Sequence, residues 1–77
     1  MWIKHNNALY NTDDIYEIKV YRTQIKARFK ATNESVVIGS FRTMQEAEKI
    51  LHNISQSLLF EDKDHPGIII KDTKEKK

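Results

Sequence analysis

The sequence predicts an α+β domain: an antiparallel meander of about five strands, covered by one amphipathic helix and followed by a short C-terminal strand. Polar and apolar residues alternate with period two along residues 15–31, and apolar residues recur at helical spacing along residues 43–60. Turn-forming residues separate these runs. We assign residues 1–70 to a single domain and residues 71–77 to a charged flexible tail.

The composition is that of a small globular protein. Of its 77 residues, 39% are hydrophobic and 31% are charged. A chain of this size buries only about 60% of the surface that it exposes when unfolded, so its core is thin. The absence of cysteine excludes disulfides, thiolate metal sites and a cysteine nucleophile. Local packing or oligomerisation is left to stabilise the fold, and homodimerisation stays open.

The N-terminal residues lack the apolar stretch that a signal peptide needs, and the apolar run Ile68–Ile70 is far too short to span a membrane. We therefore expect a cytoplasmic protein with no membrane partner.

The first strands are short. Trp2–His5 and Ala8–Tyr10 read as two strands joined by the turn Asn6-Asn7. Four turn-forming residues, 11–14, then break the chain.

Residues 15–31 predict a hairpin with one apolar face. If Arg22 and Thr23 form its turn, the strands pair in one definite register; a four-residue loop with the same register stays open. The apolar pairs are then Val20 with Ile25, Ile18 with Ala27, and Tyr16 with Phe29. The outward pairs are Glu17 with Arg28, and Lys19 with Lys26.

Val36–Phe41 predicts a fifth strand whose facing the sequence leaves open. Ile38 and Phe41 are both apolar residues expected in the core, but in a regular strand they would point to opposite faces. A bulge at Gly39 would let both point inward.

The helix begins at a capping box, in which Thr43 accepts from the amide of Glu46. Its predicted buried stripe contains Met44, Ala47, Ile50, Leu51, Ile54 and Leu58. After a turn at residues 65–67, Ile68–Ile70 is expected to join the sheet; exchange of this strand between two chains is the alternative.

Two resemblances rest on short motifs. The first motif set is Trp2-Ile3-Lys4, Leu9-Tyr10-Asn11-x-Asp13-x-Ile15 and Gly39-x-Phe41-x-Thr43-x-x-Glu46-Ala47. Over residues 1–60 it resembles a group of short uncharacterised bacterial and phage proteins that look like pared-down pleckstrin-homology-like meanders with a C-terminal helix. This resemblance implies a fold and no activity.

The second motif set is Ile25-Lys26-Ala27-Arg28-Phe29, Val37-Ile38-Gly39-Ser40-Phe41-Arg42-Thr43 and Glu46-Ala47. It is similar to the plant Apetala-type DNA-binding domain and to the arm-site-binding domain of tyrosine-recombinase integrases. The resemblance implies a three-stranded sheet in the major groove, with Lys26, Arg28 and Lys30 at outward basic places. The chain departs from those domains in its first strand, which is not arginine-rich.

Positive charge is concentrated in the hairpin, where five cations stand against one carboxylate in residues 15–31. Cations so spaced can neutralise phosphates, and a tyrosine can stack on a base. The candidate nucleic-acid-binding residues are Lys19, Tyr21, Arg22, Lys26, Arg28 and Lys30. The competing interpretation is a solvated outer face whose lysines discourage edge pairing.

No other residues form a chemical motif. His5, His52 and His65 are expected to be surface or edge histidines, because no pair has metal-ligand spacing. The pairs Asp13–Asp14 and Asp62–Asp64 lack the further ligands of a calcium loop, and Asp13 is expected to accept from turn amides. The aromatic residues read as core or rim packing.

We therefore expect a non-enzymatic binding or regulatory module with no cofactor, metal or small-molecule substrate. Its first expected role is protein–protein interaction or self-association through a sheet edge or the C-terminal strand. The alternative is nucleic-acid binding through the basic outer face of the 15–31 hairpin.

Overall fold

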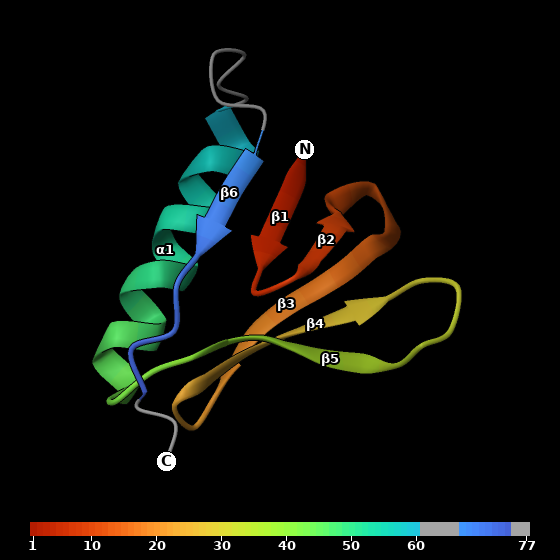
Figure 1. Ribbon diagram of the computed structural model, residues 1–77. Coiled ribbons are helices and arrows are strands. Elements are labelled where there is room, and N and C mark those ends of the chain that lie inside the picture. Colours follow the sequence, from red (N-terminus) through yellow and green to blue (C-terminus); the bar gives the residue numbers. More distant parts are fainter. Residues whose placement is uncertain (61–66, 75–77) are drawn as a thin grey trace.

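The computed structural model describes residues 1–60 and 67–74. In these ranges it has six strands, one α-helix and one 3-10 turn, η1 (Figure 1). The elements are β1 Trp2–His5, β2 Ala8–Asn11, η1 Thr12–Asp14, β3 Ile15–Tyr21, β4 Gln24–Phe29, β5 Ser35–Ser40, α1 Met44–Phe60 and β6 Gly67–Ile70. The predictions for the side chain of Phe60, for Asp62, Asp64 and His65, and for the turn before β6 lie outside the described residues.

The strands form two three-stranded sheets, in the orders β2-β1-β6 and β3-β4-β5. The α+β class is confirmed, as are its antiparallel strands, its single helix and the short C-terminal strand. The meander divides after β2, where Asn11 caps η1 by accepting a hydrogen bond from the Asp13 amide at 3.0 Å. The side-chain acceptor for a turn amide is therefore Asn11 and not, as predicted, Asp13. β6 joins the small sheet parallel to β1, which the intervening helix allows.

The β3–β4 hairpin has the predicted register, with Val20 opposite Ile25, Ile18 opposite Ala27, Glu17 opposite Arg28 and Lys19 opposite Lys26. Its turn is the two-residue one, since Tyr21 is paired with Gln24. Arg22 adopts a left-handed backbone with φ 58°, which is uncommon outside glycine and asparagine.

The predicted pairing of Tyr16 with Phe29 is wrong. A β-bulge between Ile15 and Glu17 places Ile15 opposite Phe29. Tyr16 becomes the extra residue, lies 50% exposed, and donates its hydroxyl hydrogen bond to Asn33 Oδ1 at 2.7 Å. The extra residue shifts the side-chain alternation by one position, so Ile15 takes the inward place.

A second bulge decides the facing of β5. Ile25 is paired with Gly39 and Lys26 with Val37, so Ile38 is the extra residue. Ile38 and Phe41 are both buried, as predicted, but the bulge lies at Ile38 and not at Gly39, which is paired with Ile25. A Cβ at Gly39 would lie 2.8 Å from the Phe41 ring, so this position accommodates the ring only as glycine.

The helix begins as predicted, with the Glu46 amide donating to Thr43 Oγ1 at 3.1 Å. Ala47 and Ile54 are buried in the core, and Ile50, Leu51 and Leu58 pack against it. The prediction that Met44 belongs to the buried stripe is wrong, because this residue is 48% exposed. It lies in the first turn of α1, and the helix reaches the core one turn later, at Ala47.

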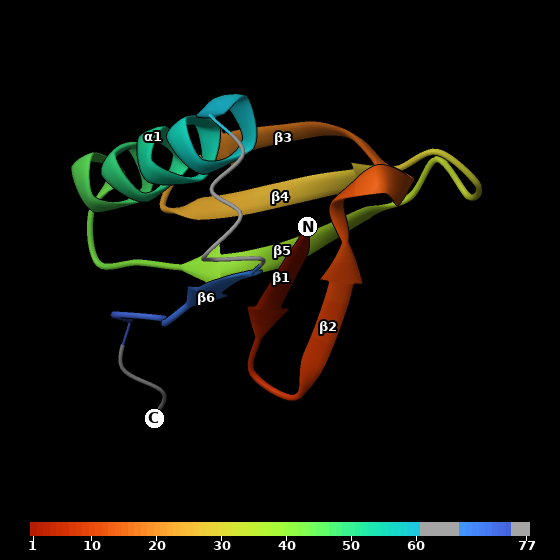
Figure 2. The same ribbon diagram turned by 90° about the horizontal axis from the view of Figure 1, so that it is seen from above.

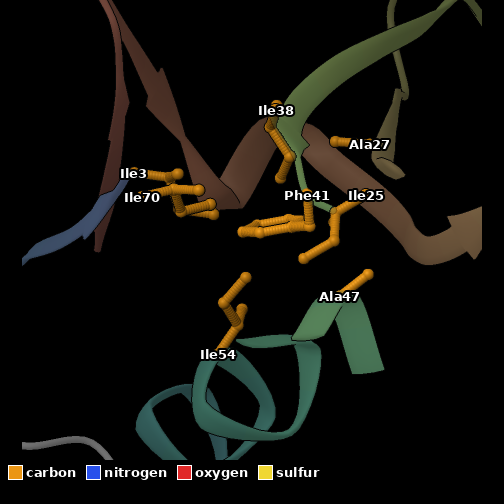
Figure 3. Packing of buried hydrophobic residues seen from close by; sticks show 8 residues of the cluster. All are labelled: Ile3, Ile25, Ala27, Ile38, Phe41, Ala47, Ile54 and Ile70. Carbon is orange, nitrogen blue, oxygen red and sulfur yellow. The ribbon is translucent and has the colours of Figure 1, made fainter. Parts of the chain in front are cut away.

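One core joins the two sheets and the helix. The small sheet contributes Ile3 and Ile70, and the large sheet contributes Ile25, Ala27 and Ile38. Figure 3 shows the Phe41 ring lying between these side chains and Ala47 and Ile54 of α1. Figure 2 shows α1 beside β3 at one side of the large sheet and the small sheet at the other.

The start of the predicted tail is bonded to the domain. Asp72 Oδ1 accepts the Ser40 amide and lies 2.8 Å from His5 Nε2. Thr73 donates its hydroxyl hydrogen bond to Glu46. The prediction of a surface or edge position for His5 is wrong: it is buried, because β6 makes β1 the central strand and His5 is on its inner face.

Candidate functional site

The basic residues of the hairpin divide into two groups. Lys19 and Lys26 are cross-strand partners. The Lys26 Nζ lies 4.6 Å from the centre of the Tyr21 ring, and the Arg22 guanidinium lies 5.5 Å from it. Such cation–π contacts contribute about 0.5–1 kcal/mol at exposed sites. Lys19, Tyr21, Arg22 and Lys26 therefore gather at the turn end of the hairpin.

Arg28 lies toward the other end of β4 and is bonded within the fold. Its Nη1 donates to the Tyr16 hydroxyl at 3.3 Å, and its Nε lies 3.8 Å from a Glu17 carboxylate oxygen. The hydrogen bond with Tyr16, followed by the smaller effect of the Glu17 charge, raises the pKa of Arg28. Lys30 follows β4 and is exposed. Of the six predicted residues, four therefore lie at the turn end of the hairpin, whereas Arg28 is bonded to Tyr16 and lies near Glu17, and Lys30 lies beyond the end of β4.

The large sheet has two edge strands, β3 and β5, each of which pairs only with β4 among the described strands. The β3 edge is the one that α1 contacts. Backbone bonds show which residues face this edge. The Phe29 amide donates to the carbonyl of Glu34, the residue before β5, whereas the Lys30 amide donates to the carbonyl of Asp14, the residue before β3. Even-numbered residues of β4 therefore face β3, and their partners on β3 are odd-numbered. The backbone groups of Ile18 and Val20 consequently point toward the free edge.

A hollow of about 400 Å³ lies beside this edge, between β3 and the C-terminal half of α1. Ile15 and Ile18 line it from the sheet, and Leu51, Ile54 and Leu58 line it from the helix. The remaining lining residues are Thr12, Asp13, Tyr16, Glu17 and Ser55. We call this hollow together with the outward backbone of Ile18 and Val20 the β3 groove.

The β3 groove is apolar with an acidic end. Asp13 and Glu17 are its charged lining residues, and no lysine or arginine lines it among the described residues. A partner side chain entering here would meet apolar carbon from two elements and a carboxylate at the margin.

Sequence reasoning missed the β3 groove. The four turn-forming residues before Ile15 marked the place where the chain breaks, but not that β2 leaves the sheet there and exposes β3. The departure depends on β1 pairing with β6, a contact between the two ends of the chain that no local pattern encodes.

No group of three histidine, aspartate or glutamate side chains within the described ranges is placed to hold a metal ion. His52 is exposed on α1, with Gln56 Nε2 at 3.5 Å from its Nε2. No helix in the part of the chain described is long and apolar enough to cross a membrane.

Comparison of the chain with protein-family models, with curated proteins and with solved structures found no match.

Proposed function

We propose that this chain is a non-enzymatic binding module that takes an extended segment of another protein as an additional strand along β3. The observation that carries the proposal is the juxtaposition of a free strand edge and an apolar hollow under the helix. Strand addition uses both: main-chain hydrogen bonds supply affinity, and pockets for alternate side chains supply specificity.

The β3 groove has the dimensions and backbone that such a segment needs. The outward groups of Ile18 and Val20 offer hydrogen bonds to a new strand. Side chains on one face of that strand would then enter the hollow between Ile18 and Leu51, since alternate residues point to one side. Its volume of about 400 Å³ falls within the range of about 300–1,000 Å³ usual for ligand sites.

The charge of the groove supports a particular partner. Two carboxylates line the groove: Glu17 lies 3.8 Å from Lys19 Nζ and from Arg28 Nε, whereas Asp13 forms no ion pair with a described residue. Because Asp13 leaves this margin acidic, the expected segment alternates apolar residues with lysine or arginine. The alternative occupant is a second copy of the chain, paired edge to edge along β3. The experiment below distinguishes it from a peptide partner.

Filling the hollow tests this function. The probe is a blocked, fluorescently labelled heptapeptide that alternates valine with lysine, and its counterpart alternates valine with glutamate. We expect saturable anisotropy for the lysine peptide only. Ser55→Phe should weaken binding about tenfold or more, because the new ring occupies the hollow. Gln56→Phe, the next helical position but outside the lining, is the matched control and should bind as the parent does.

Equal binding by the Ser55→Phe and parent proteins would contradict the proposal. So would light scattering that shows a dimer lost in Ser55→Phe together with no peptide binding, which would assign the edge to a second copy.

A second candidate, nucleic-acid binding, is supported by Arg22 and Lys26, which lie over the Tyr21 ring, and by Lys19 opposite Lys26, although Lys19 Nζ also lies 3.8 Å from Glu17 Oε1. Release of counterions from about three phosphates predicts a slope near −2.7 for log affinity against log salt on duplex DNA. Lys26→Glu should reduce both the affinity and the slope. Lys49→Glu, an equal charge change at an exposed helical position, should reduce the affinity much less. Anisotropy of a labelled duplex that stays flat at low salt would remove this candidate.

A further inference from the structure

We propose that the outer face of the small sheet is a second docking surface, independent of the β3 groove, for an acidic and apolar segment of another protein. The register places three exposed residues in one row, with Lys4 of β1 directly between Leu9 of β2 and Ile69 of β6. Trp2 forms the next row, between Asn11 and Gly67. We call Trp2, Lys4, Leu9 and Ile69 the outer patch.

The outer patch is the unpacked side of a sheet whose other side is buried. Ile3, His5 and Ile70 of the same strands face the core, whereas Leu9 is 65% exposed, Ile69 is 68% exposed and Trp2 is 49% exposed. Figure 2 shows the small sheet at the margin of the molecule. Large apolar side chains gathered on an exposed face mark interaction sites in soluble proteins.

The charge beside the outer patch is positive. A hollow of about 420 Å³ adjoins Ile69 and is lined by Lys4, Lys71 and Lys74, together with Asp72. The Asp72 Oδ1 is bonded to His5 and to the Ser40 amide. In the described ranges none of the three lysines forms an ion pair. A partner with carboxylates therefore complements this surface.

The position of Lys4 favours a protein segment, and not a lipid surface, as the partner of the outer patch. Any partner that covers both Leu9 and Ile69 also removes the Lys4 stem between them from water. Removing an unpaired ammonium from water is costly unless an opposite charge meets it. A strand or helix can bring one carboxylate to that point between two apolar contacts, whereas an acyl layer would surround it with hydrocarbon.

Trp2 is the only tryptophan of the chain, so its fluorescence reports on the outer patch directly. The probes are a blocked peptide alternating leucine with glutamate and its lysine counterpart. We expect a saturable blue shift with the glutamate peptide that weakens as salt rises, and none with the lysine peptide. Lys4→Glu should weaken binding about tenfold or more. Lys49→Glu, on the exposed side of α1, is the matched control and should leave it unchanged.

Leu9→Ser is a second variant, which removes apolar contact without changing charge, and circular dichroism checks that each variant is folded. Ser55→Phe should leave this binding intact, so failure here and failure of the β3 groove are distinguishable. The proposal is overturned if Trp2 does not respond to the glutamate peptide, if Lys4→Glu binds like the parent, or if vesicles of phosphatidylserine and phosphatidylcholine shift Trp2 while the peptide does not.

Discussion

Single residues decide how the two sheets meet. The Phe41 ring lies where both sheets and the helix converge, and it reaches that place by passing over Gly39 (Figure 3). The backbone at Gly39 needs no positive φ. Space, and not conformation, is therefore the reason for glycine there.

Gly39→Ala should destabilise the fold. The new methyl group would stand 2.8 and 2.9 Å from two Phe41 ring carbons and 3.1 Å from Ile70 Cγ2. Overpacking of this kind costs about 1–3 kcal/mol, which corresponds to a fall in Tm of roughly 5–20 °C for a domain of this size. Thermal denaturation followed by circular dichroism measures it.

Gly67→Ala is the matched control, because its nearest contact is a single backbone oxygen, that of Trp2, at 3.3 Å. A smaller fall in Tm is expected. An unchanged Tm for Gly39→Ala would show that the core around Phe41 is loosely packed and would contradict the close approach described above.

At the scale of elements, local patterns predicted most of what the structure contains. Period-two alternation located β3 and β4 and their register, and the capping box located the start of α1. What failed were features that depend on distant contacts. The bulge at Tyr16 places Ile15 instead of Tyr16 on the inward face. The Tyr16 hydroxyl donates a hydrogen bond to Asn33, which lies in another turn. Burial of His5 follows from β6, which a local pattern cannot assign to β1.

The same limit applies to the candidate sites. The basic residues could be found by counting charges, but the pairing of Arg28 with Tyr16 and Glu17 could not. The β3 groove needs two facts that only the fold supplies: that β2 leaves the large sheet, and that α1 lies beside β3.

The link between the C-terminal residues and the start of α1 makes a prediction about pH. The hydrogen bond from Thr73, followed by that from the Arg42 amide, lowers the pKa of Glu46 below its usual 4.5. A carboxylate with a depressed pKa in the folded state stabilises the protein above its unfolded pKa, and this contribution is lost as pH falls through the folded pKa.

Glu46→Gln should therefore lower Tm at neutral pH, and the difference from the parent should shrink as pH falls below about 4.5. Thermal denaturation between pH 7 and pH 3 tests this expectation. Glu48→Gln, on the same helix, is the control and should give no comparable loss at neutral pH. A Tm difference between Glu46→Gln and the parent that is the same at every pH would contradict the link.

At the scale of the whole molecule, one small core closes two sheets against one helix, and our two proposals concern different surfaces of it. One is the edge of β3 beside the acidic end of its hollow, and the other is the outer patch beside a lysine-lined hollow. Their opposite charges suit partners of opposite sign, so a single domain of this size has room for two dissimilar contacts.

The most direct measurement of the central proposal is amide hydrogen exchange along β3 by NMR, with and without the valine–lysine peptide. The backbone N–H of Lys19 points toward β4, so this amide should be protected in both states and serves as the internal reference. The Ile18 and Val20 amides should exchange rapidly in the free protein and become protected when the peptide binds. Equal protection of all three amides in the free protein, or no change at Ile18 and Val20 when peptide saturates the protein, would contradict the account.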